Sequence, residues 1–183
     1  MIAVILFYGF IAGVIVAGPM LWSFLTLAPG EHPPLGMLAG YLIMLVALTA
    51  VFLGVKSYRD KVLGGAIRFL PALGVGLAIT LVASVMYVLA WEVVMAYSNF
   101  DFTEFYASYL RDAAKGGTPE QIAKAAADAK EFTINYSKPL YRMPWTFIEI
   151  FPVGLLVSLI TAAVLRNSRV LPARAAAQAR HGG

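Results

Sequence analysis

Four long apolar stretches constrain this sequence more than any other feature. The chain is 60% hydrophobic and only 13% charged, whereas a soluble domain is about half apolar and about one quarter charged. As a helix rising about 1.5 Å per residue, the stretch 35–55 spans roughly 31 Å, close to the thickness of a bilayer's hydrocarbon core. The sequence therefore predicts an all-α integral membrane protein. Its four transmembrane helices are expected at about residues 2–28, 35–55, 69–91 and 145–165.

The first apolar stretch is expected to remain in the protein as a span. A cleavable signal peptide has a basic region followed by a short apolar region. No basic residue precedes Ile2, and the apolar run continues to about residue 28, well beyond the length of such a region. We therefore expect a retained transmembrane helix.

Residues 99–144 are the one substantial polar segment between the predicted spans. Asp101 and Glu104 match the two side-chain positions of a capping box, and Thr118-Pro119-Glu120-Gln121 matches a second helix start. The pair Gly116-Gly117 separates the two predicted helices. Phe and Tyr side chains recur on one helical face. We therefore expect an amphipathic helical hairpin between spans three and four, with its aromatic stripe on the membrane surface or on the span ends.

Positive charge gathers in two segments that lie on the same side of a four-span bundle. The turn at 29–34 has no Lys or Arg, and the segment 99–144 has six basic and six acidic side chains. Cytoplasmic loops are enriched in Lys and Arg, so both termini are expected in the cytoplasm and the hairpin outside it. The expected division is a transmembrane domain, 1–168, and a flexible basic cytoplasmic tail, 169–183. The cations are Lys56, Arg59, Lys61 and Arg68 after the second span, and Arg166, Arg169, Arg174 and Arg180 after the fourth.

The chain resembles a known family in three places. These are Gly54-Val55-Lys56-x-Tyr58-Arg59-Asp60-x-x-x-Gly64-Gly65, the Thr-Pro-Glu-Gln helix start, and the Ala-Ala-Val-Leu-Arg run that ends the last span. Together they are similar to the bacterial membrane proteins grouped as domain of unknown function forty-one ninety-nine, over roughly residues 5 to 168. The resemblance implies a four-span protein of the bacterial inner membrane with an extracytoplasmic helical insertion. It implies no catalytic residues.

The polar break after the second span is the first candidate site. Lys56, Arg59 and Lys61 are candidate contacts for lipid headgroups or another anion, because a guanidinium forks onto phosphate and Lys offers a point charge. Gly64-Gly65 would turn the chain into the third span. Two interpretations stay open. The break either holds the fold in the headgroup region, or it docks an anionic ligand or partner.

Two membrane carboxylates, Glu92 and Glu149, form the second candidate site. An ionisable group inside a span is costly unless it is paired, hydrated or protonated, and such groups are functional candidates. Glu149 precedes Pro152, which frees a backbone carbonyl and can open a pocket under the hairpin. Glu149 is expected either to reach Arg142, Tyr41 or interfacial water, or to handle a proton or another cation. An outer vestibule containing both carboxylates is the corresponding hypothesis.

Glycine pairs mark helix faces on which another helix can approach closely. Gly9 and Gly13 lie one turn apart in the first span, and Gly36 and Gly40 open the second. Packing inside one bundle is the first interpretation, and a dimer motif is the alternative. Membrane lipids and a second copy of the chain are therefore the expected partners.

Little in the sequence indicates catalysis. The chain has no Cys and two His, and it carries no phosphate-binding glycine loop and no nucleophile elbow. The net charge of +4 does not indicate nucleic acid, because the basic residues flank apolar runs. No enzyme activity, metal or cofactor is expected. The predicted function is that of an envelope accessory or interaction protein, and the alternative is a small oligomeric transporter or channel that uses the membrane carboxylates.

Overall fold

The computed structural model describes residues 1–28, 31 and 37–173, and these residues form six α-helices and no strands. Four of the helices are long and apolar enough to cross a membrane, which confirms the predicted all-α membrane fold. The turn at 29–34 apart from Glu31, the expected start of the second span at residue 35, and the tail from 174 lie outside the described residues. The helices are α1 (Ile2–Leu25), α2 (Met37–Lys61), α3 (Phe69–Tyr97), α4 (Phe102–Ala113), α5 (Pro119–Tyr136) and α6 (Pro139–Leu165).

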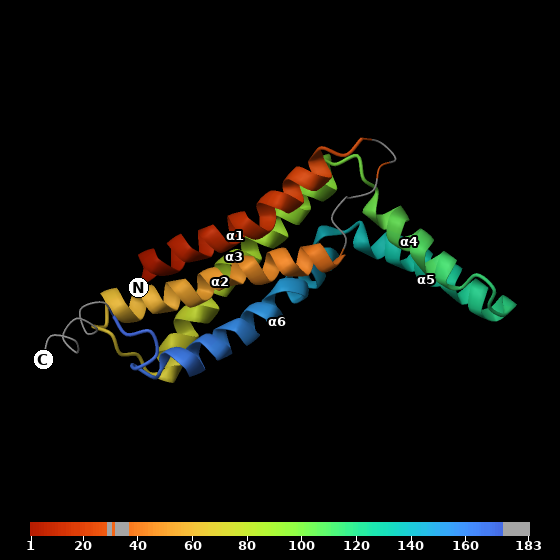
Figure 1. The fold of residues 1–183 in the computed structure, drawn as a ribbon. Helices are drawn as coiled ribbons and strands as arrows, with labels where there is room; N and C mark the ends of the chain where they lie inside the picture. Colours follow the sequence, from red (N-terminus) through yellow and green to blue (C-terminus); the bar gives the residue numbers. More distant parts are fainter. Residues whose placement is uncertain (29–30, 32–36, 174–183) are drawn as a thin grey trace, which may run out of the picture.

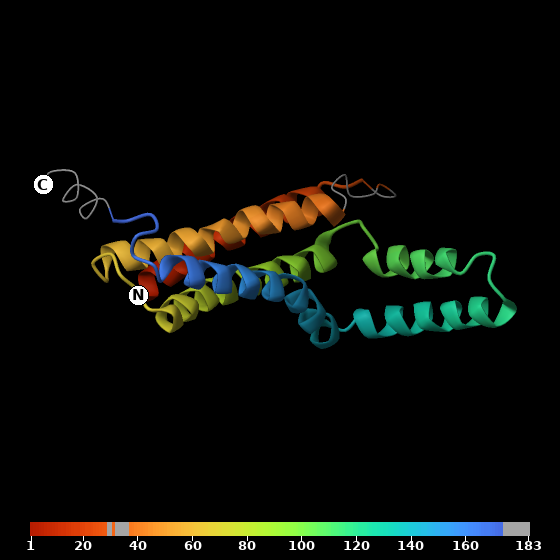
Figure 2. The same cartoon turned by 60° about the horizontal axis from the view of Figure 1, so that its bottom comes forward.

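The four long helices lie side by side as a bundle, and α4 and α5 project from one end of it (Figures 1 and 2). Helix α3 contacts each of the other three long helices, and α2 contacts α1 and α6. Helices α4 and α5 run antiparallel and pack on each other. Met1 lies at the end of the bundle opposite α4 and α5, where α2 and α6 also end (Figure 1).

Helix α2 continues through the residues expected to form a polar break. The apolar pattern predicted an end at about residue 55, but Lys56–Lys61 belong to the helix. Lys56 and Asp60 form an ion pair at helical spacing, and such pairs support a helix. The turn comes later, at Gly64 and Gly65, whose φ angles of 70° and 102° favour glycine. The Gly65 N–H donates to the Arg59 carbonyl at 2.9 Å, which closes the helix end.

Helices α3 and α6 both extend beyond their predicted apolar limits at the end that carries α4 and α5. Helix α3 was expected to end at about residue 91 and reaches Tyr97. Helix α6 was expected from residue 145 and begins at Pro139, with two residues between it and the end of α5. The added turns contain Glu92 and Arg142, which bond to each other. Because each charge is satisfied by the other, both helices continue past their apolar segments.

Small residues bring α3 close to its neighbours in the bundle core. A Cβ atom added to Gly9 of α1 would lie 2.6 Å from Cβ of Val82, and one added to Gly13 would meet the Met86 side chain. Gly154 of α6 lies in the same way against Thr80. The pair Gly9 and Gly13 therefore packs inside this bundle, which is the first of the two interpretations of the motif. Gly36 lies outside the described residues.

Both predicted helix starts of the hairpin segment are present, although the Glu104 side chain pairs with Arg111 and does not complete a capping box. The Glu104 N–H donates to the Asp101 carboxylate at 3.0 Å, and Thr118 forms a reciprocal capping box with Gln121. The aromatic stripe lies mainly between α4 and α5, where the rings of Tyr106 and Phe132 are 4.5 Å apart. It also meets a span end, because Phe102 packs edge-on against Trp91 of α3.

Candidate functional site

Glu92 is held in an ion pair with Arg142, and this pair ties three helices together. Arg142 Nε donates to Glu92 Oε1 at 2.8 Å, and Nη2 contacts the second carboxylate oxygen. Arg142 Nη1 donates to the carbonyls of Ser137 at 3.0 Å and Tyr136 at 3.4 Å, where α5 ends. The Arg142 side chain is only 10% exposed. Arg142 was one of the expected partners of Glu149, beside Tyr41 and interfacial water, but it bonds the other membrane carboxylate.

Glu149 has a phenol as its partner. The hydroxyl of Tyr87, on α3, donates to Glu149 Oε2 at 3.2 Å. In the part of the chain that the structure describes, Glu149 forms no ion pair. Tyr87 was not singled out in the sequence, although a phenol inside an apolar span, one turn before Trp91, is a signal that points to a polar partner. The second expected partner, Tyr41, lies in the same cavity.

Glu149 lines a cavity of about 270 Å³ at the end of the bundle that carries α4 and α5. All six helices contribute to its wall. Glu92 is not part of the wall, so the structure does not place the two carboxylates in one vestibule. The lining residues are Val16, Met20, Ser23 and Phe24 of α1, Gly40, Tyr41, Ile43 and Met44 of α2, Tyr87 and Trp91 of α3, Phe102 of α4, Tyr136 of α5, and Glu149 of α6.

The cavity has a mouth and a deep end. Gly40, Tyr41 and Glu149 are its exposed lining residues, so its mouth lies between α2 and α6. Trp91 and Ser23 are each 7% exposed and lie at the deep end. The Ser23 hydroxyl has no hydrogen-bond partner among the described residues. A buried polar atom without a partner calls for an explanation, such as a bound water or ligand.

The inner wall of the cavity is a fixed set of aromatic rings. Trp91 Nε1 donates to the Tyr136 hydroxyl at 3.1 Å, and the Trp91 ring packs edge-on against Phe24 and Phe102 at 5.4 and 5.1 Å. Burial raises the pKa of the Tyr136 phenol, so this residue stays neutral at physiological pH. The arrangement offers ring faces and edges together with a single carboxylate.

At the end of the bundle opposite α4 and α5, some of the predicted anion-binding cations point into the protein and others are exposed. The Arg59 side chain is fully buried, and its Nε donates to Asp60 Oδ1 at 2.7 Å. Its Nη1 donates to the Val170 carbonyl at 2.9 Å and to the Leu165 carbonyl at 3.5 Å, and Nη2 donates to Leu171. The Arg59 guanidinium, which was expected to contact a lipid phosphate, is therefore bonded to other groups of the protein.

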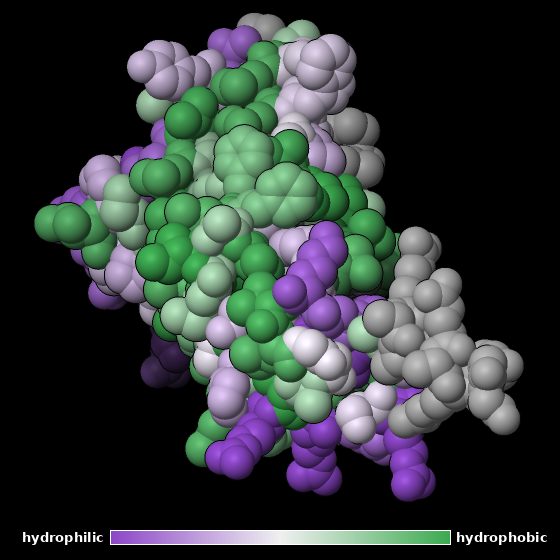
Figure 3. All heavy atoms as spheres, turned by 90° about the vertical axis from the view of Figure 1, so that its left-hand side faces the viewer, coloured by the Kyte–Doolittle hydropathy of each residue, from purple (hydrophilic) through white to green (hydrophobic). Residues whose placement is uncertain are grey.

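The other two cations of this group differ in their surroundings. Lys56 is paired with Asp60 and partly buried, whereas Lys61 is exposed. Figure 3 looks onto this end, where hydrophilic side chains gather beside a largely hydrophobic surface. Lys61 is thus the member of the predicted headgroup set that remains free to face a membrane surface.

Arg59 and Arg142 play the same structural part at opposite ends of the bundle. Each places its guanidinium on backbone carbonyls that follow or end a helix, and each also bonds a carboxylate. The last carbonyls of a helix have no intrahelical partner. An arginine fork satisfies several of them at once, which a lysine does not. The hydrogen-bonding capacity of both side chains is directed to the protein itself.

Comparison with known families gives one match. A model of the family described as "Protein of unknown function (DUF4199)" matches residues 5–167. The chain belongs to the DUF4199 family. Comparison with curated proteins and with solved structures found no similar protein. The match contains every residue that lines the cavity, and it ends before Val170 and Leu171, two of the carbonyl partners of Arg59.

The chemistry available in this DUF4199 chain is limited by its polar groups. Among the described residues, no group of three His, Cys, Asp or Glu side chains gathers in a way that holds a metal ion. The cavity contains hydroxyls and one carboxylate. This set suits noncovalent recognition of a partly apolar molecule.

Proposed function

We propose that this DUF4199 chain is a non-enzymatic accessory protein of the bacterial inner membrane that binds a small molecule in the cavity beneath α4 and α5. The observation that carries the proposal is a cavity of about 270 Å³ lined by a carboxylate that has no cationic partner among the described residues. An ionisable group inside a span is expensive and marks a functional site. A ligand that bonds Glu149 would offset this cost.

The packing of the other half of the bundle favours binding over conduction. Between the cavity and the end that carries Met1, the core contains fully buried side chains from all four long helices, with Ala12 of α1 among them. They include Val51 and Val55 of α2, Ile79 of α3 and Leu165 of α6, each 0% exposed. The cavity is therefore a pocket in one half of the bundle. A channel in a single copy of the chain would need an opening through this packed layer.

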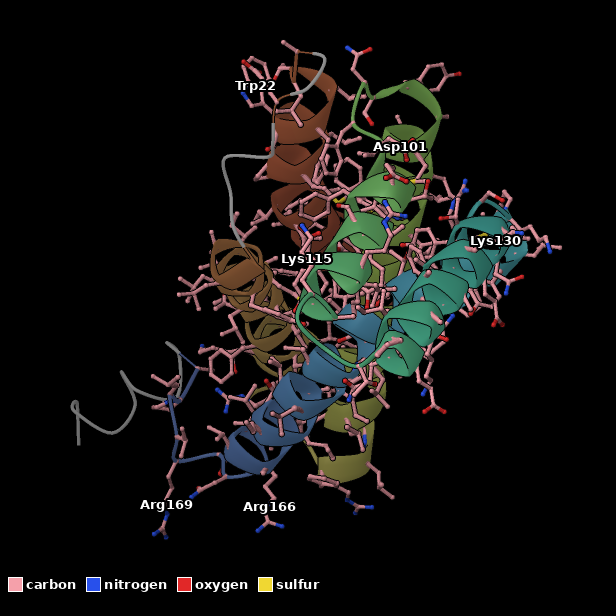
Figure 4. The ribbon with its side chains drawn as sticks, turned by 90° about the vertical axis from the view of Figure 1, so that its right-hand side faces the viewer. Trp22, Asp101, Lys115, Lys130, Arg166 and Arg169 are labelled. Carbon is pink, nitrogen blue, oxygen red and sulfur yellow. The ribbon has the colours of Figure 1, made fainter. Side chains whose placement is uncertain are left out.

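The distribution of charge supports cytoplasmic termini. The bundle end with Met1 also holds the exposed cations Lys61, Arg68, Arg166 and Arg169. Arg166 and Arg169 point away from the bundle (Figure 4). At the other end, the segment 99–144, which contains α4 and α5, has six acidic and six basic side chains. The positive-inside rule then places the cavity in the extracytoplasmic half of the membrane.

Orientation is tested by labelling single cysteines, since the natural chain has none. Lys115 lies between α4 and α5, and Arg169 follows α6, and both are exposed. A membrane-impermeant maleimide added to intact spheroplasts is expected to label Lys115→Cys and to spare Arg169→Cys until the membrane is permeabilised. The opposite pattern contradicts the proposed orientation.

Ligand binding is tested by native mass spectrometry of the protein released from native-lipid nanodiscs. The Gly40→Leu variant places a side chain in the cavity mouth, and Gly74→Leu is its matched control. Both glycines lie on spans with open space around an added Cβ, and Gly74 is outside the cavity. The wild type and Gly74→Leu are expected to carry a bound species that Gly40→Leu loses. Equal mass profiles for all three contradict the proposal.

A further inference from the structure

We infer that the ligand of this cavity is a small organic cation, an amine or quaternary ammonium that carries an apolar group. The inference deepens the proposed function and rests on it. Three features lead to this class: the charge of the cavity wall, its aromatic composition, and the position of its mouth.

The first feature is a carboxyl group without a cationic partner. Glu149 is the one Asp or Glu that lines the cavity among the described residues, and no Lys, Arg or His lines it. Its hydrogen bond comes from the neutral Tyr87 hydroxyl. The cation expected to reach it, Arg142, is bound to Glu92 and to the end of α5. A positive ligand supplies the charge that the protein does not, whereas an anionic ligand would be repelled.

The second feature is the large share of aromatic rings in the cavity wall. A cation over the face of Trp, Tyr or Phe is attracted by the ring quadrupole, and quaternary ammonium groups are recognised in aromatic cages. The Trp91 ring is held by its hydrogen bond to Tyr136, so this part of the wall is preorganised. The rings of the wall belong to Phe24, Tyr41, Tyr87, Trp91, Phe102 and Tyr136.

An inorganic divalent cation does not suit the same wall. Calcium takes about six to eight oxygen ligands, and magnesium demands an octahedral shell of oxygens. The described lining offers one carboxylate and a few hydroxyls among mostly apolar side chains. A compact ion loses a strongly bound water shell that this wall does not replace. An organic cation, whose charge is spread over alkyl groups, is less strongly hydrated, so the same wall can compensate for its desolvation.

The third feature is the position of the polar groups along the cavity. Glu149 lies at the mouth between α2 and α6, and the unpartnered Ser23 hydroxyl lies at the deep end. Because the mouth lies between two of the candidate membrane spans, a ligand that partitions into the bilayer would have a direct route of entry. Its charged group is expected beside Glu149 and the ring of Tyr87, whose hydroxyl bonds that carboxylate, with its apolar part deeper in the cavity among the other rings and the side chains of Met20 and Met44.

The experiment compares a cation with its neutral isostere. Benzyltrimethylammonium and neopentylbenzene have the same shape and differ in one unit of charge. Their affinities for the protein in nanodiscs are measured by isothermal titration calorimetry, with empty nanodiscs as the blank. The cation is expected to bind at least about tenfold more tightly than the isostere. Equal affinities, or tighter binding of the neutral compound, would overturn the inference.

Two variants test the role of the carboxylate. Glu149→Gln keeps the size of the side chain and removes its charge, and Glu120→Gln removes one exposed negative charge at the start of α5. The first is expected to weaken cation binding at least about tenfold, and the second to leave it within about twofold. Cation affinity unchanged by Glu149→Gln contradicts the inference. The isostere comparison uses the unaltered chain, so it decides the question even where a variant does not fold.

The result also separates this inference from the proposed function. If the wild type carries a bound species that Gly40→Leu loses, but the cation shows no preference over its isostere, the cavity binds a ligand of another class. The inference then fails and the proposed function stands. If no species depends on the cavity and neither probe binds, both fail.

A second pair of variants examines the deep end. Ser23 and Ser84 are buried serines whose hydroxyls have no partner among the described residues, and only Ser23 lines the cavity. Tyramine carries an ammonium group at one end and a phenol hydroxyl at the other, so its hydroxyl can bond a group at the deep end while its ammonium group lies beside Glu149. Ser23→Ala is expected to weaken tyramine binding about threefold or more, and Ser84→Ala to leave it unchanged. Equal effects of the two variants would remove Ser23 from the proposed site.

Discussion

Arg142 of α6 and Glu92 of α3 form a two-point ion pair, with Arg142 Nε 2.8 Å from Glu92 Oε1. The same guanidinium bonds two carbonyls at the end of α5. One side chain thus fixes where α5 ends, where α6 begins, and how both lie against α3. It also leaves Glu149, on the next part of α6, without a cationic partner in the described structure. Because Glu92 takes the Arg142 guanidinium, the Glu149 carboxylate remains available to a ligand.

Loss of either partner in this pair is expected to destabilise the protein strongly. Glu92→Ala leaves a largely buried guanidinium without its carboxylate, and breaking a buried pair in this way costs about 3 kcal/mol or more. The free energy of unfolding is measured by denaturant titration in mixed micelles. The control is Asp112→Ala, which breaks the exposed pair with Lys115 and is expected to cost less than about 1 kcal/mol. Equal effects of the two variants would contradict the role assigned to Glu92.

Arg59 is expected to resist replacement even by lysine. Arg59→Lys keeps the positive charge but loses the fork that bonds Asp60 and the carbonyls of Leu165, Val170 and Leu171. A loss of about 2 kcal/mol in unfolding free energy is expected. Hydrogen exchange followed by mass spectrometry should show faster exchange over residues 166–173. Lys61→Ala, which removes an exposed cation from the same turn, should leave that exchange unchanged. Slow exchange in Arg59→Lys would show that the fork does not hold this segment.

The glycines of the bundle are expected to differ sharply in their tolerance of alanine. A Cβ at Gly154 would overlap Thr80, and overpacking of this kind costs about 1–3 kcal/mol. Gly74→Ala is the control, because no heavy atom lies within 4 Å of its added Cβ. It should be neutral or slightly stabilising, since alanine favours a helix over glycine. The comparison is made from unfolding curves in the same micelles. A Gly154→Ala variant as stable as Gly74→Ala would refute the close approach of α3 and α6.

The start of α4 is expected to respond to acid through Asp101. The Glu104 N–H and the Thr103 hydroxyl donate to the Asp101 carboxylate and hold its pKa below the ordinary value of 3.8. A lowered folded-state pKa means that the charged cap contributes fully above about pH 4 and less as pH falls through the folded-state pKa. Below that range, the Glu104 amide should therefore lose protection from hydrogen exchange. The increase in its exchange rate should exceed the change that pH alone causes in an unprotected amide.

The matched variant for this titration is Asp101→Asn. Asparagine caps a helix about as well as aspartate and does not titrate. In Asp101→Asn, the protection of the Glu104 amide should be independent of pH between about 2 and 5. The same loss of protection in both proteins would show that another group controls the start of α4.

The sequence alone determined the features that depend on composition and local spacing. Four apolar runs of membrane length predicted four spans, because only a helix satisfies its own backbone in lipid. The starts of α4 at Asp101 and α5 at Thr118 followed from side chains three residues away, within reach of their own helix. The gathering of cations at one end followed from counting charges between spans.

Only the tertiary structure decided which polar groups meet. Arg142 lies 50 residues from Glu92 and seven from Glu149, yet it pairs with the more distant of the two in sequence. Successive helix residues turn by about 100°, so the rotation of each span decides which side chains meet. Those rotations are set by close contacts such as Gly154 against Thr80. The burial of Arg59, the Tyr87 partner of Glu149, and the cavity itself all follow from that packing, which no local pattern encodes.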